Sequence, residues 1–330
     1  MKKFRLFLFS QGILLFFSAL FFPGFARPAD FDGLSGANLC FRLEQMVVIT
    51  NPGGEVKKIQ GEIPVLSWQE PPYYQAVEKV SAVPAVHWHA SGRWAEISSG
   101  PVPAGGRLEY RFTYLLTYKD GVMTDPPNCQ AQPHEFRDME RYLQAEEGIE
   151  VGDPMLTAVV SRQVARLATP KEKARRLFAY VNEKLTYRVD FSRKASAVTA
   201  LKSGWGRCED FALLYVALCR TAGVPARVVY GFRLDRKELK PGQRIPLNNS
   251  HHAWVEVFLP GTGWIPVEPT FLAEQNGRKI VDYRSFGGFY SGDIHLFMAY
   301  NKGSITLKYY SAGEGKLEIA ENYQLTLLDR

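Results

Sequence analysis

The chain has few cysteines, and no two of them are spaced for zinc or redox chemistry. Cys40, Cys129, Cys208 and Cys219 are its four cysteines, and none belongs to a C-x-x-C pair. Zinc sites and thioredoxin-like motifs depend on such pairs, so both classes are disfavoured. Cys219 follows Cys208 by eleven residues, about 16 Å along one helix, which is too far for a disulfide. Two alternatives remain for Cys40 and Cys129, which are a disulfide between them or two free thiols.

The chain also lacks a strong charge bias. Its formal net charge is +6, and removing residues 1–26, which hold three basic and no acidic residues, lowers it to +3. No basic stripe is present, so we do not expect nucleic acid as a partner. No calcium-loop pattern, internal repeat or low-complexity segment is present either.

Only the first residues resemble a membrane segment, because no later run approaches the ~20 apolar residues that a span requires. Lys2, Lys3 and Arg5 precede an apolar stretch, and small residues stand at Gly24 and Ala26. This pattern is typical of an export signal over residues 1–26. We therefore expect a periplasmic or secreted protein with no membrane span beyond the leader. The alternative is retention by an uncleaved N-terminal anchor.

The remaining chain is predicted to be an α+β protein. Short alternating strands with proline and glycine turns predict a β-sandwich domain over residues 27–134. Residues 135–290 read as helices followed by strands that form an antiparallel sheet, and residues 291–330 as C-terminal strands packing on this core. We expect His87, His89 and His134 to be surface or packing residues.

Within the core, the spacing of apolar residues predicts the elements. Thr169 followed by proline is a typical helix start, and Gly223 a typical helix end. The expected helices are 154–167, 170–184 and 208–222. The expected strands are 226–230, 252–259, 264–271, 294–309 and 315–328.

Cys208 is the candidate nucleophile. It stands in G-W-G-R-C-E-D-F-A at the predicted start of an apolar helix, where Gly204 and Gly206 permit a tight approach. The helix dipole and the free backbone amides stabilise a thiolate there, and the same amides can stabilise an oxyanion. Asp210 suits the first turn of this helix. Cys219 has no polar context and reads as a buried structural cysteine.

A predicted hairpin brings a base and a carboxylate together. Pairing the apolar residues of its two strands places Val255 opposite Val267 and Val257 opposite Ile265. This register puts Glu268 one diagonal step from His252, within hydrogen-bond reach. His252 is then the general base and acid, and Glu268 orients it.

Other residues complete the predicted site. His251 is the competing base, although its side chain should point away from the active face. Trp254 and Glu256 share the face of His252 and are interpreted as site walls. The backbone amide of Cys208 is the expected oxyanion donor, with Tyr187 or Trp205 as side-chain contributors.

The chain resembles the transglutaminase-like superfamily, which has a papain-like core. The resemblance is carried by four segments that occur in the family's order: GRCEDFA, RTAGVPARVVYGF, HAWVEVF and GWIPVEPT. The resemblance covers about residues 150–275, and the N-terminal region also resembles the sandwich of exported bacterial members. It implies a Cys-His-Asp triad carried by Cys208, His252 and Glu268. Glutamate stands where the family usually has aspartate, and its extra methylene requires the carboxylate to fold back or the strands to shift.

These patterns predict a cysteine enzyme that acts on peptide or protein amides of the cell envelope. Attack by Cys208 gives a thioester, which water or an amine then resolves, as in an amidase or protease and in a transglutaminase. Such a mechanism requires no cofactor and no metal. The alternative is a catalytically silent binding or scaffolding module, and a thiol-disulfide or metal protein is disfavoured.

Overall fold

The computed structural model describes residues 38–119, 139–270, 272–275, 278–289, 292–301, 303–311 and 316–329. The expected leader, Cys129 and His134 lie outside these residues. None of the helices within the described ranges is long and apolar enough to cross a membrane.

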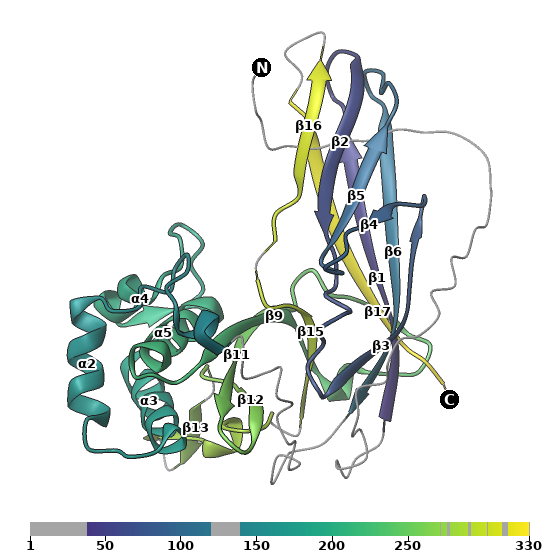
Figure 1. Ribbon diagram of the computed structural model, residues 1–330. Helices are drawn as coiled ribbons and strands as arrows, with labels where there is room; N and C mark the ends of the chain where they lie inside the picture. Colours follow the sequence, from purple (N-terminus) through teal and green to yellow (C-terminus); the bar gives the residue numbers. More distant parts are fainter. Residues whose placement is uncertain are drawn as a thin grey trace.

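Two antiparallel sheets form an elongated sandwich, drawn upright in Figure 1. One sheet has the order β10-β17-β1-β6-β3 and the other β16-β2-β5-β4. Their strands are β1 (Asn38–Thr50), β2 (Val56–Pro64), β3 (Gln75–Val83), β4 (His87–Trp88), β5 (Trp94–Ser99), β6 (Arg107–Lys119), β10 (Arg244–Pro246), β16 (Thr306–Ser311) and β17 (Glu318–Leu327).

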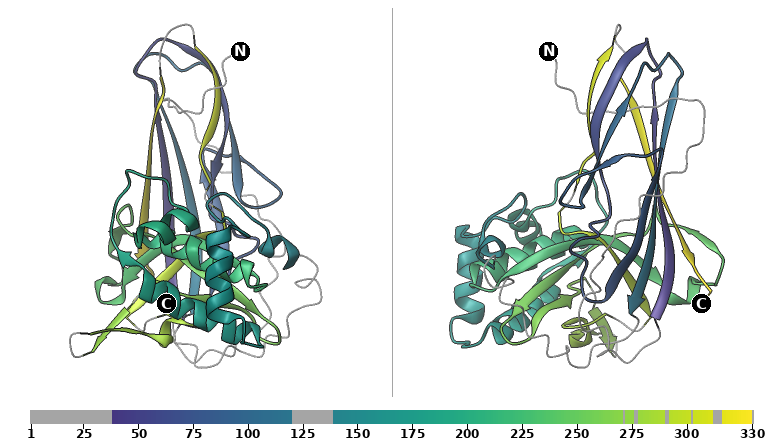
Figure 2. Two further views of the ribbon diagram at one scale, coloured as in Figure 1. Left: turned by 90° about the vertical axis from the view of Figure 1, so that its left-hand side faces the viewer. Right: turned by 45° about the vertical axis from the view of Figure 1, so that its right-hand side comes forward.

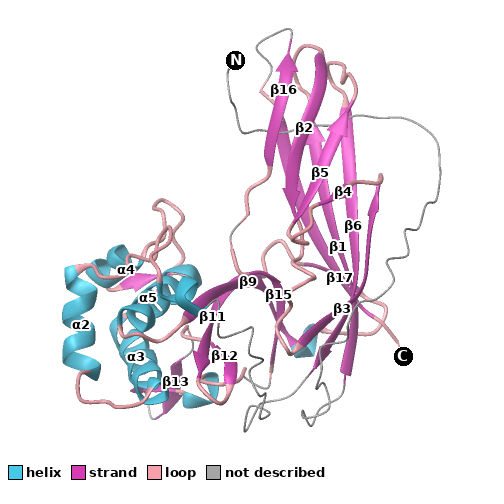
Figure 3. Ribbon diagram, in the orientation of Figure 1, coloured by secondary structure: helices cyan, strands magenta, loops and turns pink. Residues whose placement is uncertain are grey.

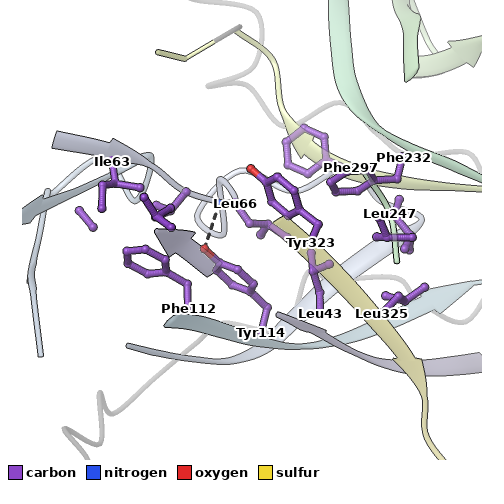
Figure 4. Packing of buried hydrophobic residues seen from close by; sticks show 14 of the residues in the cluster. Leu43, Ile63, Leu66, Phe112, Tyr114, Phe232, Leu247, Phe297, Tyr323 and Leu325 are labelled. Carbon is purple, nitrogen blue, oxygen red and sulfur yellow. Dashed lines mark hydrogen bonds between the residues drawn. The ribbon is translucent and has the colours of Figure 1, made fainter. Parts of the chain in front are cut away.

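The sandwich forms because its long strands alternate apolar and polar residues. Phe41, Leu43 and Val47 of β1 are fully buried, as are Phe112 and Tyr114 of β6. Successive side chains of a strand point to opposite faces, so this spacing gives each sheet one apolar face. Figure 4 shows Leu43, Phe112 and Tyr114 packed in the same apolar cluster as Ile63 and Leu66.

The second part of the molecule is a sheet of order β12-β11-β9-β15 with α-helices gathered on one side, coloured cyan in Figure 3. The helices are α2 (Pro154–Val164), α3 (Pro170–Lys184), α4 (Ala197–Ser203) and α5 (Cys208–Thr221), with 3₁₀ turns η2 (Met139–Leu143), η3 (Arg236–Glu238) and η4 (Tyr283–Ser285). The strands are β9 (Ala226–Asp235), β11 (His251–Leu259), β12 (Gly263–Val267) and β15 (Asp293–Ala299), beside the small pairs β7 (Thr186–Tyr187) with β8 (Trp205–Gly206) and β13 (Leu272–Gln275) with β14 (Arg278–Val281).

The helix ends follow the local sequence signals. Thr169 and Glu172 form the capping box that starts α3, and Gly223 adopts φ 77° just after α5, in the left-handed region that favours glycine. The predicted bounds of α3 are confirmed. The first predicted helix is shorter than expected, because α2 ends at Val164 and not at residue 167.

The predicted register of the hairpin is confirmed. Val255 pairs with Val267 and Val257 with Ile265, as the apolar pattern requires. β12 ends at Val267, so Glu268 is the first residue beyond the strand and not a paired member of it.

The C-terminal strands differ in part from the expectation that residues 291–330 pack on the core. β15 joins the core sheet beside β9. β16 and β17 instead pair with β2 and β1 and complete the two sheets of the sandwich. The chain therefore returns to the sandwich after the core, as the yellow strands in both views of Figure 2 show.

A single apolar cluster joins the sandwich to the core sheet. Phe232 of β9 and Phe297 of β15 pack with Leu43, Tyr323 and Leu325 of the sandwich (Figure 4). A second cluster lies between α2–α5 and the other face of the sheet. β11 thus has apolar packing on both sides, and it lies beside α5 (Figure 1).

Candidate active site

Cys208 is the first residue of α5, and the start of this helix is tightly fixed. Asp210 accepts a hydrogen bond from the Arg207 amide at 3.0 Å and pairs with Arg193 at 3.0 Å. A Cβ at Gly206 would lie 2.3 Å from the Asp210 Cβ, so only glycine permits this approach. The predicted role of Asp210 in the first turn is therefore observed, and the Cys208 side chain is half-buried at the positive end of the helix dipole.

The structure brings His252 and Glu268 into direct contact. Nε2 of His252 lies 2.6 Å from Oε2 of Glu268, and both side chains are buried. The Cys208 side chain is a further hydrogen-bond partner of His252. Because Nε2 is engaged by the carboxylate, Nδ1 is the ring nitrogen left for exchange of a proton with the thiol. Thiol, imidazole and carboxylate thus form one chain of contacts.

The charges in this chain of contacts favour a protonated imidazole. Burial by itself lowers the pKa of His252, but the Glu268 carboxylate and the Cys208 sulfur outweigh it and raise that pKa from 6.5 to about 10. Burial raises the pKa of Glu268, yet His252 and His295 together hold it well below its ordinary range. A buried carboxylate that stays ionised beside an imidazolium is the arrangement that orients a catalytic histidine.

Four donors surround the Glu268 carboxylate. His252 and His295 reach Oε2 at 2.6 and 3.2 Å. The Thr270 amide donates to Oε1 at 2.9 Å, and the Thr270 hydroxyl donates to the same oxygen. The glutamate side chain is one methylene longer than the aspartate that the resemblance implies; it begins one residue beyond β12, and both of its carboxylate oxygens accept hydrogen bonds.

His295 is the residue that sequence reasoning missed. It lies on β15, is fully buried, and stacks on Phe289 with ring centres 4.1 Å apart and planes 9° apart. Burial lowers the pKa of His295, so the ring is neutral and donates from Nε2 to the carboxylate. A histidine within the apolar run Ile294–Met298 was the available signal, because a buried polar side chain requires a partner.

The predicted wall and oxyanion residues take different positions. Trp254 is buried behind the imidazole, 6.3 Å from it and nearly parallel, and its indole N–H donates to the Tyr74 hydroxyl at 3.1 Å. Trp254 is therefore a packing wall and has no donor left for an oxyanion. The Trp205 ring lies between the guanidinium groups of Arg188 and Arg193, at 4.3 and 4.4 Å.

Tyr187 lies nearer to the reacting groups. β7 pairs with β8 so that Tyr187 stands opposite Gly206, two residues before Cys208. Partial burial raises the pKa of Tyr187, and the charges of Cys208 and Glu268 raise it further. The hydroxyl therefore stays protonated at neutral pH and remains a hydrogen-bond donor within electrostatic range of Cys208.

Two other residues point away from the site. His251 packs against Phe232 and Tyr323, with ring centres 4.9 and 5.7 Å away. The interpretation of Glu256 as a site wall is corrected: its carboxylate is buried and pairs with Arg227 at 2.7 Å. Side chains two residues apart share a face of β11, but Glu256 lies four residues along the strand from His252 and meets different neighbours.

Donor atoms of His252, Glu268 and His295 lie within 4.8 Å of one another, a spacing that could also suit a metal ion. The three side chains already hydrogen-bond directly at 2.6 and 3.2 Å. We therefore interpret the cluster as a hydrogen-bonded network centred on the Glu268 carboxylate, in which the buried Nδ1 of His295 has no hydrogen-bond partner among the described residues.

Comparison with known proteins agrees with this geometry. A profile described as the transglutaminase-like superfamily matches residues 157–269, which include all three residues of the Cys-His-Glu chain. The structure resembles that of a candidate cysteine protease from Cytophaga hutchinsonii with a TM-score of 0.50 and 16% identity, over 88% of this chain and 98% of the other. That likeness shows the fold alone.

Two curated relatives match a shorter part. The uncharacterized protein YebA of Bacillus subtilis is 44% identical over 69 residues, 20% of this chain and 9% of its own length. A protein-glutamine gamma-glutamyltransferase of Pseudomonas aeruginosa is 40% identical over 68 residues, 20% of this chain and 10% of its own length. The chain thus spans about a tenth of the length of these two relatives.

Proposed function

Because residues 157–269 of this chain belong to the transglutaminase-like superfamily, we propose that the protein is a cysteine enzyme acting on peptide or protein amides. The observation that carries the proposal is the buried 2.6 Å contact between His252 and Glu268, with Cys208 as the further partner of His252. A nucleophile, a base and a group that orients the base are the parts that acyl transfer through a thioester requires.

The first half of the reaction forms the thioester. In the resting pair the Cys208 proton is held on Nδ1 of the His252 imidazolium, and the thiolate sulfur attacks the amide carbonyl carbon. The developing oxyanion is stabilised by the Cys208 backbone amide at the start of α5, with the Tyr187 hydroxyl beside it. His252 then returns its proton to the amide nitrogen, the C–N bond breaks, and the amine leaves.

The second half releases the acyl group. Water or a second amine gives a proton to His252 and attacks the thioester carbonyl carbon. The C–S bond breaks, the sulfur leaves as a thiolate, and the proton stays on His252, which regenerates the resting thiolate–imidazolium pair. Glu268 remains ionised throughout, held by His295 and Thr270, and stabilises the imidazolium.

The expected leader over residues 1–26 supports a reaction outside the cytoplasm, on peptides or proteins of the cell envelope. This location supports the choice of peptide and protein amides as the substrate class. The protein of P. aeruginosa whose name describes glutamine acyl transfer makes glutamine amides the first donors to test.

The test uses dimethylcasein as acyl donor, with and without monodansylcadaverine. We expect ammonia release without the amine and fluorescent casein with it, and the ratio of the two measures water against amine as acceptor. Cys208→Ser should abolish both products, whereas Cys219→Ser, at a buried cysteine of the same helix, should retain both. No Cys208-dependent product on casein or on a panel of glutamine and peptide amides would favour the silent binding module.

A further inference from the structure

An exposed apolar strip lies next to the nucleophile. Tyr187, Val189 and Phe191 are 51%, 60% and 79% exposed, and they make up three of the seven exposed large apolar side chains in the described ranges. Such side chains gathered on five residues are unusual on a free surface and mark a place where another molecule binds. We call residues 187–191 the apolar strip.

The strip is fixed to the segment that carries Cys208. The Arg207 guanidinium donates to the Asp190 carbonyl at 2.9 Å and lies 4.9 Å from the centre of the Phe191 ring. At the other end, Tyr187 stands opposite Gly206. Both ends of the strip are thus held by the two residues that precede Cys208, so a molecule bound along it passes the thiol.

The strip also presents a strand edge. The Thr186 amide donates to the Gly204 carbonyl and the Arg188 amide to the Gly206 carbonyl, both at 2.9 Å. Neighbouring residues of a strand direct their backbone groups to opposite edges, so the N–H and C=O of Tyr187 point away from β8. In the part of the chain that the structure describes, β7 pairs with β8 alone. The second edge of β7 is therefore available for pairing with a strand from another molecule.

We propose that the apolar strip docks the acyl-donor substrate as an extended peptide segment with bulky apolar side chains, added along the open edge of β7. This inference rests on the proposed function and names the kind of peptide that the site takes. The strand edge holds the peptide backbone, while Val189 and Phe191 contact its apolar side chains. The reactive amide is thereby carried to Cys208. Arg188 and Asp190 interrupt the apolar side chains with charge, which suits a single peptide better than a lipid surface.

The test uses peptidyl chloromethyl ketones, which alkylate the thiol and therefore need no known substrate. An apolar probe built on Leu-Phe and a polar probe of equal length built on Gly-Ser are compared, with iodoacetamide as a reagent that carries no peptide. The apolar probe should alkylate Cys208 about tenfold faster than the polar one, the size of effect given by burying one large side chain. N-methylation of its backbone amides should remove much of that advantage, because the strand hydrogen bonds are lost.

Variants assign the preference to the strip. Val189→Ser with Phe191→Ser should abolish the preference for the apolar probe and leave the iodoacetamide rate unchanged. Val83→Ser, at a valine of the sandwich that is 69% exposed, is the matched control and should retain the preference. Both side chains of the double variant are exposed, so folding should be unaffected, and a thermal melt checks this.

The outcomes separate the two proposals. Fast, His252-dependent iodoacetamide labelling with equal rates for both probes would overturn the strip and leave the enzyme standing. Slow labelling by iodoacetamide, unaltered by His252→Ala, would overturn both. If the double variant instead lost binding to phosphatidylethanolamine–phosphatidylglycerol vesicles and kept its probe preference, the strip would be a lipid contact and the inference would be wrong.

Discussion

Replacing Glu268 by glutamine should lower the pKa of His252 from about 10 to near its ordinary 6.5. The variant keeps the size of the side chain but removes its charge. Burial, which by itself lowers the pKa of His252, is then opposed by the Cys208 side chain alone. The imidazole should therefore be cationic at pH 8 in the wild type and largely neutral at that pH in the variant.

The magnitude follows from the geometry of the pair. With 2.6 Å between Nε2 and Oε2, the charge centres lie about 4 Å apart, which gives about 4 kcal/mol at an effective dielectric constant of about 20. At roughly 1.4 kcal/mol per pKa unit this is about three units, so removing the carboxylate should return the pKa of His252 from about 10 to near its ordinary value.

The assay is an NMR titration of the histidine ring signals between pH 5 and 11 in wild type and variant. The chain has six histidines, so a His252→Asn sample assigns the signal of interest. A wild-type His252 that titrates below pH 7 would refute the reasoning, as would a Glu268→Gln variant with an unaltered titration. A thermal melt of each sample confirms that the variant is folded.

The same pair gives a stability profile with a defined sign. The pKa of His252 is raised, so its contribution is complete below pH 6.5 and is lost as the pH rises toward about 10. The pKa of Glu268 is lowered, so its contribution is present above the ordinary carboxyl range and is lost in acid. The melting temperature of the wild type should therefore fall between pH 6.5 and 10 more than that of Glu268→Gln.

Three further substitutions test the surroundings of the site. Gly206→Ala forces a methyl group against Asp210 and should cost about 1–3 kcal/mol of stability as well as slow alkylation of the thiol; unaltered melting and labelling would contradict this. Arg227→Met leaves the buried Glu256 charge unpaired and should destabilise the protein by about 3–5 kcal/mol, measured by urea unfolding, whereas the double change with Glu256→Leu should restore much of the loss. His295→Ala removes a donor that keeps the triad carboxylate ionised, so the acid limb of the rate profile should move to higher pH, with His295→Gln moving it less; identical profiles would assign His295 to packing alone.

The site could be predicted from the sequence where local patterns determine it. The alternation of Val255 and Val257 against Ile265 and Val267 fixed one register, and that register brought Glu268 toward His252. Cys208 could be placed because glycines and an apolar run mark a helix start.

Other features depend on contacts between distant segments. His295 reaches the site because β15 pairs with β9, and β16 and β17 return to the sandwich. Alternation of apolar and polar residues predicts a strand with one buried face. It does not determine which strand lies next to it, because many strands share the same pattern. Glu256 was misplaced for a related reason: sharing a face of one strand does not fix what packs against each position.

The central claim is that His252 activates Cys208, and the rate of iodoacetamide alkylation against pH tests it most directly. Mass spectrometry locates the label, while Cys40 and Cys219 are buried and serve as internal controls. We expect rapid labelling of Cys208 at pH 6 in the wild type and loss of that acid-side reactivity in His252→Ala, because the imidazolium partner is removed. Slow labelling in both proteins, rising together only near pH 8.5, the behaviour of an ordinary thiol at about that pH, would contradict the account.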